Sequence, residues 1–165
     1  MRRAWVIVMA LLVVAALATP AAAVPPGRNV EGTMTGPGGF RFTGCAGIIT
    51  EVGSGTFTAK TLGSGTYSFE VCISGSSPFT FSGTATLVAR NGARLDGVIN
   101  GTGSQPEFPV AITGGTKQFS HAAGDLVLGP FSESDQHNCD PRVGICIDWT
   151  DTGPITGTLR NVGPS

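Results

Sequence analysis

The sequence predicts an all-β fold, a compact antiparallel β-barrel of eight strands, and two observations carry that prediction. The first is composition: Gly alone supplies 25 of the 165 residues, Gly, Ser and Thr together exceed a third of the chain, and charged residues are only 13%. Helical bundles and coiled coils need Ala, Leu, Glu, Lys and Arg instead. The second is an alternation of apolar and polar side chains, which places successive residues on opposite faces of a strand.

Four runs of this alternation follow one another along the chain. Apolar residues take every second position in stretches that begin near Phe40, Tyr67, Phe79 and Leu95. Half-buried antiparallel strands have this pattern, and glycines inside such runs indicate bulges or sharp bends. We count about eight or nine strands, enough to close a small barrel; a β-sandwich of two packed sheets is the alternative.

Gly-rich segments separate the predicted strands. Asn91-Gly92 predicts a two-residue hairpin turn with positive φ at both residues. Gly53-Ser54-Gly55 and Gly63-Ser64-Gly65 are further hairpin candidates, and the Thr-Gly-Gly-Thr segment at 113–116 breaks a strand that starts near Phe108. No convincing amphipathic helix follows the N-terminal segment.

The first 23 residues have the three parts of a cleaved export signal. Two arginines precede an apolar run from Ala4 to Leu17, and the small residues Ala21 and Ala23 indicate cleavage before Val24. The apolar run is shorter than the roughly 20 residues that a membrane-spanning helix needs. We therefore expect a secreted protein, extracellular or in the cell envelope, with no stable membrane insertion after cleavage.

The remaining chain is predicted to be a short linker at 24–28 and a single β-barrel domain at 29–165. The full chain has a net charge of −1, and loss of the two signal arginines makes the remainder more acidic. Its cations are scattered, whereas nucleic-acid phosphates require a clustered basic surface. We therefore expect no nucleic-acid partner, and the sequence leaves the oligomeric state open.

Four cysteines, an even number in a chain with an export signal, predict two disulfides. Cys139 and Cys146 bound a short segment containing Pro and Gly, which favours their pairing. Elimination would join Cys45 to Cys72, but a simple meander places a strand near 56–62 between them. Two strand spacings of about 9.6 Å exceed the reach of a disulfide, so this second pairing stays open.

A recognisable pattern runs from Val110 to Leu126: a strand, Thr-Gly-Gly-Thr, then Phe119 and an Ala-x-Gly segment. It resembles the allene oxide cyclase and dirigent barrels, and most closely the small exported bacterial proteins of that superfamily. The resemblance covers residues 84–128 and implies a compact eight-stranded barrel. A common form of the motif has Gly where this chain has Lys117. The resemblance assigns no catalytic residue, because the family's catalytic set does not map onto this chain position by position.

Three residues are candidates for a functional site. His121 and Asp125 follow the motif and could act in acid–base catalysis, with an exposed place at the barrel rim as the alternative. Trp149 is a candidate ligand contact, with a core position as the favoured alternative. The acidic segment from Glu133 to Asp151 offers oxygen ligands for Ca²⁺, but its spacing matches no EF-hand, so we expect neither a metal nor a cofactor.

These features favour a non-enzymatic exported binding module for a small apolar ligand or a surface partner. The alternative is an isomerase or cyclase that acts on an apolar substrate in the barrel cavity, and it requires an ionisable group with a perturbed pKa inside the barrel. A barrel of eight strands can be filled by side chains or can hold one small ligand. Eight phenylalanines are candidates for the interior: Phe40, Phe42, Phe57, Phe69, Phe79, Phe81, Phe108 and Phe119.

Overall fold

The computed structural model describes residues 26–42, 45–103, 107–140 and 145–164, so the predicted export signal lies outside the described residues. The elements are β1 (Arg28–Arg41), β2 (Ile49–Ala59), β3 (Gly63–Ser74), β4 (Phe79–Ala89), β5 (Arg94–Gly103), β6 (Phe108–Gly115), the short 3-10 helix η1 (Lys117–Phe119), β7 (Ala123–Leu128), β8 (Ser132–Asp140) and β9 (Ile145–Arg160). Within these ranges, no helix is long and apolar enough to cross a membrane.

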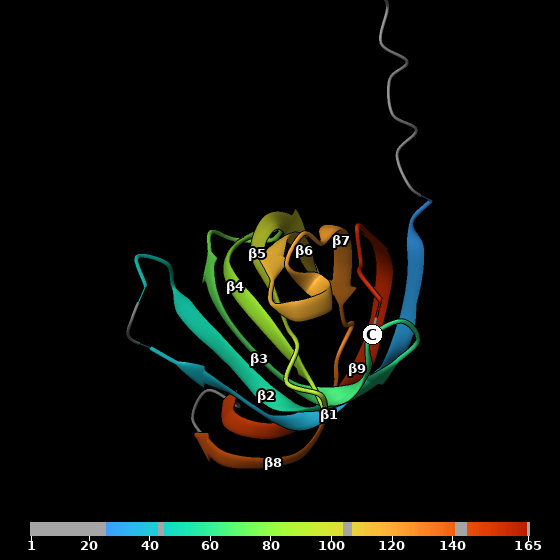
Figure 1. Ribbon diagram of the computed structural model, residues 1–165. Coiled ribbons are helices and arrows are strands. Elements are labelled where there is room, and N and C mark those ends of the chain that lie inside the picture. Colours follow the sequence, from blue (N-terminus) through green and yellow to red (C-terminus); the bar gives the residue numbers. More distant parts are fainter. Residues whose placement is uncertain (1–25, 43–44, 104–106, 141–144, 165) are drawn as a thin grey trace, which may run out of the picture.

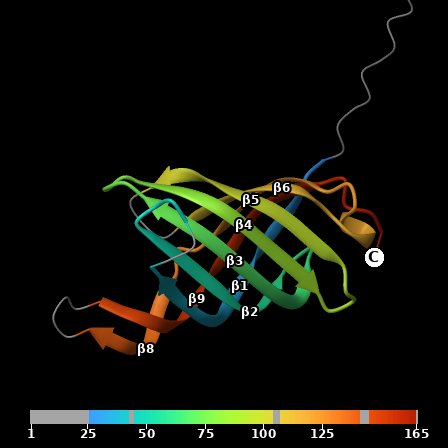
Figure 2. The ribbon, with the colours of Figure 1, turned by 90° about the vertical axis from the view of Figure 1, so that its left-hand side faces the viewer.

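Antiparallel pairing in chain order builds one continuous sheet from β1 to β7, and β7 then pairs with β9. Strand β9 pairs back to β1 over twelve residues, which closes the sheet into an eight-stranded barrel and confirms the predicted fold class (Figure 1). Strand β8 is additional, because it pairs only with the first part of β9. The β8–β9 hairpin therefore leaves the wall at one end of the barrel (Figure 2).

The barrel interior is apolar and largely aromatic. The rings of Phe69, Phe81, Phe108 and Phe131 form a connected cluster, with centroid distances of 5.3 to 6.1 Å. Burying each such side chain stabilises the fold by about 1.5–3 kcal/mol. The expectation that Phe42 points inward is wrong, because its side chain is 63% exposed beyond the end of β1.

The two ends of the barrel are built differently. One end, the η1 end, carries the β2–β3 and β4–β5 hairpins and η1, which directs Phe119 inward beside the buried Leu62, Ala93 and Ala122. The opposite end, the hairpin end, carries the β1–β2, β3–β4 and β7–β8 connections and the projecting β8–β9 hairpin (Figure 2). The η1 end is thus closed by apolar side chains.

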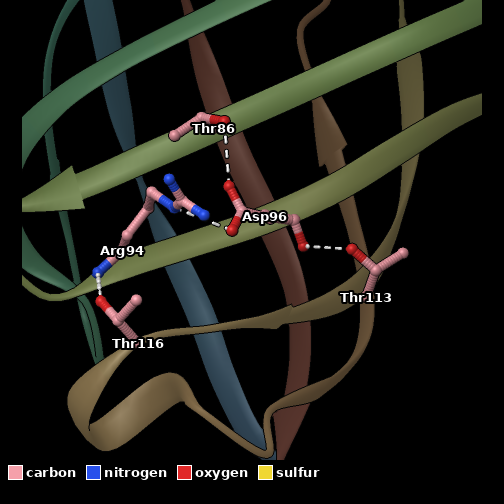
Figure 3. Close-up of polar contacts among 5 residues, drawn as sticks. All are labelled: Thr86, Arg94, Asp96, Thr113 and Thr116. Carbon is pink, nitrogen blue, oxygen red and sulfur yellow. Dashed lines mark hydrogen bonds and ion pairs between the residues drawn. The ribbon is translucent and has the colours of Figure 1, made fainter.

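The Thr-Gly-Gly-Thr segment has an architectural role at the η1 end. The register between β5 and β6 shifts next to Asp96, so β6 bulges at Thr113. The Thr113 hydroxyl donates to the Asp96 carbonyl at 3.2 Å, and the Thr116 hydroxyl accepts from the Arg94 backbone N–H at 3.0 Å (Figure 3). Gly114 has a φ of 135°, which side chains rarely tolerate. The motif fixes a bulge and a turn on the outer wall.

The β4–β5 hairpin differs from the two-residue turn predicted for Asn91-Gly92. Its connection spans residues 90–93, and Gly92 alone of the pair has positive φ, at 75°. The Gly92 N–H donates to the Ala89 carbonyl at 2.8 Å, and the Asn91 side-chain oxygen accepts from the Ala93 N–H at 3.0 Å. Asn91 therefore stabilises the turn through the hydrogen bond of its side-chain amide, without adopting the positive φ that a two-residue turn requires.

Both disulfides form, and the predicted Cys139–Cys146 pair is confirmed as a bridge between β8 and β9. Cys45 also pairs with Cys72, with their Cα atoms 5.8 Å apart. The meander is unbroken, but Cys45 lies in the connection after β1, with its Sγ 3.6 Å from the Ile49 carbonyl oxygen at the start of β2. The connection thus brings Cys45 beside β3. Two disulfides are compatible with an oxidising environment.

Candidate functional site

The inner face of β1 and β2 carries no side chains over two successive levels near the hairpin end. The residues there are Gly36 and Gly38 on β1 and Gly53 and Gly55 on β2, and we call them the glycine floor. The prediction of a hairpin at 53–55 is wrong, because these residues lie inside β2. The strands approach closely here: a Cβ on Gly36 or Gly55 would lie 2.1 Å from a carbonyl oxygen of the other strand.

Side chains from the two flanking strands lie over the glycine floor: Trp149 and Asp151 from β9, and Tyr67 and Phe69 from β3. The space they occupy exists only because the floor is bare. A Cβ on Gly38 would lie 2.0 Å from Asp151 Oδ2, and a Cβ on Gly53 would lie 2.4 Å from the Phe69 ring. Glycine at these positions therefore admits a carboxylic acid and aromatic rings into the interior.

Glu51 is the second carboxylic acid of the interior. It lies on β2 between Phe40 of β1 and Val71 of β3, and it is 4% exposed, whereas Asp151 is 1% exposed. A charged carboxylate loses favourable hydration when it is buried, so burial favours the protonated form. Burial therefore makes ionisation of either carboxyl group unfavourable, and ionisation of both at once more unfavourable still.

Burial raises the pKa of Glu51 to about 8, with smaller contributions from the negative charges of Asp151 and Glu133. Burial also raises the pKa of Asp151 to about 6, although the hydrogen bond from Trp149 acts in the opposite direction. The pKa of the Tyr67 hydroxyl rises to about 12 because of burial and the nearby Asp151 charge. At neutral pH, Glu51 is then mostly protonated and Asp151 mostly ionised.

Only part of the hydrogen-bonding capacity of this cluster is used. Trp149 Nε1 donates to Asp151 Oδ1 at 2.6 Å, and Phe40 packs edge-on against the Trp149 ring with centroids 4.6 Å apart. Within the described ranges, Asp151 Oδ2 and the Tyr67 hydroxyl are buried without a hydrogen-bond partner. Such an unpaired buried atom destabilises a fold by about 1–3 kcal/mol, and native proteins contain few of them.

The structure places the three sequence candidates in different regions. His121 and Asp125 are both exposed near the η1 end, away from the buried acids, and no ion pair joins them in the described part of the chain. Trp149 is 4% exposed, so it is buried in the interior as the alternative interpretation expected. Its hydrogen bond to Asp151 makes it part of the acid cluster. Across the residues that can be described, no three His, Cys, Asp or Glu side chains are arranged to hold a metal ion.

Sequence reasoning missed Glu51, Tyr67 and Asp151 as a site. The signal was present in the alternation, because Glu51 is in phase with the buried Phe57, and Asp151 with the buried Ile155. Two interpretations concealed it: the glycines after Glu51 suggested a turn, and Asp151 was grouped with a solvated acidic segment.

A second concave feature lies on the outer side of the wall. This outer cleft has a volume of about 410 Å³ and crosses β1, β2 and β3. Its polar lining includes Arg41, Ser54, Ser68, Glu70 and Asp148. The glycine floor separates it from the buried acids, since Gly38 and Gly53 line the cleft as well.

Fold and site together define the chain as a closed antiparallel eight-stranded barrel with one extra strand and two carboxylic acids in its interior. No known protein family matches the chain, and no curated protein matches it.

Proposed function

We propose that the protein is an exported barrel that binds a small, mostly apolar molecule at its hairpin end, between Glu51, Tyr67 and Asp151. One observation carries the proposal: Asp151 Oδ2 and the Tyr67 hydroxyl are buried in an apolar interior without partners in the described part of the chain. A polar group on a ligand would complete their hydrogen bonds. Local arrangements that lower stability in this way concentrate at functional sites.

The hairpin end supplies the route to this site. Phe131 lies on the short connection between β7 and β8, is only part-buried, and packs over Gly153, the next inward residue after Asp151 on β9. The Phe131 ring also packs against Phe69 and Phe108, with centroids 5.6 and 6.1 Å away, so we infer that a ligand enters where this side chain moves aside. Apolar pockets with a few polar groups are the usual form of small-molecule sites.

Export is part of the same proposal. The signal pattern at 1–23 supports it, and the two disulfides are compatible with an oxidising compartment. The resemblance of residues 84–128 to the allene oxide cyclase and dirigent barrels supports membership in that superfamily, whose fold is also a small antiparallel barrel.

A second candidate function is an isomerase or cyclase at the same site. The observation that favours it is the pair of pKa values, about 8 for Glu51 and about 6 for Asp151, on either side of neutrality. An acid and a base so displaced can give a proton to one atom of a substrate and take one from another. Proton transfer of this kind drives double-bond migration and ring closure.

The test is native mass spectrometry of the protein purified from the culture medium of its own host. We expect a retained small molecule in the wild type, its loss in Gly38→Ala, where the new Cβ would strike Asp151 Oδ2, and its retention in Gly27→Ala, where the nearest atom is 3.6 Å away. A wild-type protein that retains nothing and binds no member of a panel of small apolar compounds contradicts the proposal. Chemical change of the released molecule on incubation with the protein favours the second candidate.

A further inference from the structure

The interior of the barrel contains acids but no base among the described residues. All seven described Lys and Arg residues are exposed: Arg28, Arg41, Lys60, Arg90, Arg94, Lys117 and Arg160. The two ion pairs of the described ranges, Lys60–Glu31 and Arg94–Asp96, lie on the outer wall. Glu51 and Asp151 therefore have no internal counter-charge, although buried charges are normally paired.

Three side chains that carry oxygen atoms lie around the glycine floor on three strands, and the charge of Asp151 acts on both Glu51 and Tyr67. Asp151 on β9 pairs with Gly36 on β1, and Tyr67 on β3 pairs with Gly55 on β2. Asp151 and Tyr67 are therefore separated by two glycines, which have no side chains. Trp149 Nε1 donates a hydrogen bond to Asp151 Oδ1, which leaves Asp151 Oδ2 free to accept a hydrogen bond from a ligand. The Glu51 carboxyl on β2 and the unpartnered, 4% exposed Tyr67 hydroxyl on β3 add two further acceptors.

Aromatic rings surround these acceptors. Trp149 with Phe40 borders one side, and Tyr67 with Phe69, stacked at a centroid distance of 6.2 Å, borders the other. The faces of such rings carry negative electrostatic potential and attract an organic cation. Both the oxygens and the rings therefore select for positive charge.

We propose that the polar group of the bound molecule is a protonated amine, so that the ligand is a small apolar amine whose ammonium group lies between Asp151 Oδ2, the Glu51 carboxylate and the Tyr67 hydroxyl. This inference rests on the proposed function, because it assigns the ligand class of the same site. An ammonium group has three N–H donors and no acceptor, which matches three acceptors. A carboxylate ligand would meet two acids and no cation, and is excluded by repulsion.

Proton release distinguishes this proposal from the binding of a neutral molecule. The negative charges that act on Glu51 are those of Asp151 on β9 and Glu133 on β8, whereas β3 places the apolar Val71 beside it and β1 contributes glycines and Phe40. Burial, with smaller contributions from these negative charges, raises the pKa of Glu51 to about 8, so its carboxyl group is mostly protonated at pH 7. An ammonium group beside it favours the carboxylate, and the displaced proton passes to the buffer.

The experiment is isothermal titration of the disulfide-bonded protein at pH 7 with benzylamine, benzyl alcohol and benzoate, which share one ring and differ in charge. Each titration is repeated in two buffers of different ionisation enthalpy, which measures the protons released. Phe131→Ala serves as a second host protein, because removal of that ring leaves space for the benzyl group near Gly153. Glu51→Gln and Asp151→Asn are the site variants.

We expect benzylamine to bind about tenfold or more tightly than benzyl alcohol, with benzoate weakest, and to release up to one proton per molecule bound. Glu51→Gln should abolish the proton release, and Asp151→Asn should remove the preference for the amine over the alcohol. Equal binding of amine and alcohol without proton release overturns the amine assignment while leaving a ligand site in the barrel. Failure of all three probes in both the wild type and Phe131→Ala overturns the assignment together with the proposed function.

Discussion

The two ends of the barrel share one continuous wall but use it for different purposes. At the η1 end, Phe119, Leu62, Ala93 and Ala122 are buried apolar side chains that close the interior. At the hairpin end, inward-facing positions hold two carboxylic acids instead, and two polar atoms lack hydrogen-bond partners within the described residues. Apolar closure stabilises a fold, whereas unpaired burial of polar atoms opposes it. Under the proposed function, the η1 end supports stability and the hairpin end holds the ligand.

Removal of the apolar plug should have the largest effect. Phe119 is 1% exposed, so Phe119→Ala leaves a cavity at the η1 end. We expect a loss of about 3–5 kcal/mol in the free energy of unfolding, measured by guanidinium denaturation. The matched change at the hairpin end, Phe131→Ala, removes a part-buried ring and should lower stability by less. A larger loss for Phe131→Ala would reverse the assignment of roles to the two ends.

Stability should depend on pH through the hairpin end. The pKa of Glu51 rises from 4.5 to about 8 on folding, and that of Asp151 from 3.8 to about 6, so the folded state binds more protons between these values. Unfolding then becomes easier as pH rises from about 4 to about 8, and the stabilising contribution of these two groups is fully present only below about pH 4. Thermal melting at half-unit pH intervals measures this slope.

Glu51→Gln is the control for that slope. The amide cannot ionise, so the variant should lose most of the decline above pH 6 and should be more stable than the wild type at pH 9. Glu31→Gln on the outer wall, where the native carboxylate pairs with Lys60, should leave the slope nearly unchanged. A wild-type melting temperature that is flat from pH 5 to 9 would show that the interior acids carry no such penalty.

The glycine floor should tolerate no side chain. Gly38→Ala introduces a Cβ at 2.0 Å from Asp151 Oδ2 and 2.7 Å from Trp149 Nε1, so the acid must move. We expect a loss of about 1–3 kcal/mol by chemical denaturation and a change in the fluorescence of Trp149. Gly27→Ala, with ordinary contacts, should stay within about 0.5 kcal/mol of the wild type.

The smallest expected effect concerns Lys117 at the η1 end. Its φ of 54° lies in the left-handed region, which glycine adopts without strain. Lys117→Gly should therefore stabilise the protein slightly, by less than about 1 kcal/mol, despite the loss of the contact from its Nζ to the Asn91 carbonyl. Gln118→Gly, one residue later and without positive φ, should instead destabilise by about 0.5–1 kcal/mol. Equal effects of the two changes would contradict the strain at Lys117.

The sequence predicted the wall of the barrel better than its contents. Alternation around Tyr67 and Phe81 gives inward and outward faces directly, because side chains on a strand alternate. The pairing of β1 with β9 and the Cys45–Cys72 bridge depend on how the chain closes in space, so local patterns left them undetermined. Glu51 was hidden by its neighbours: glycines in mid-strand and glycines in a turn look alike until the facing strand is known.

The central claim, that two buried carboxylic acids lie inside one end of an otherwise apolar barrel, is tested most directly by titration of the side-chain carboxyl ¹³C resonances of the wild type, Glu51→Gln and Asp151→Asn. We expect two carboxyl groups to titrate far above the others, near pH 8 for Glu51 and near pH 6 for Asp151, and each resonance to disappear in its own variant. Titration of both groups near the ordinary carboxyl pKa of about 4 would place them in contact with water and would contradict the claim.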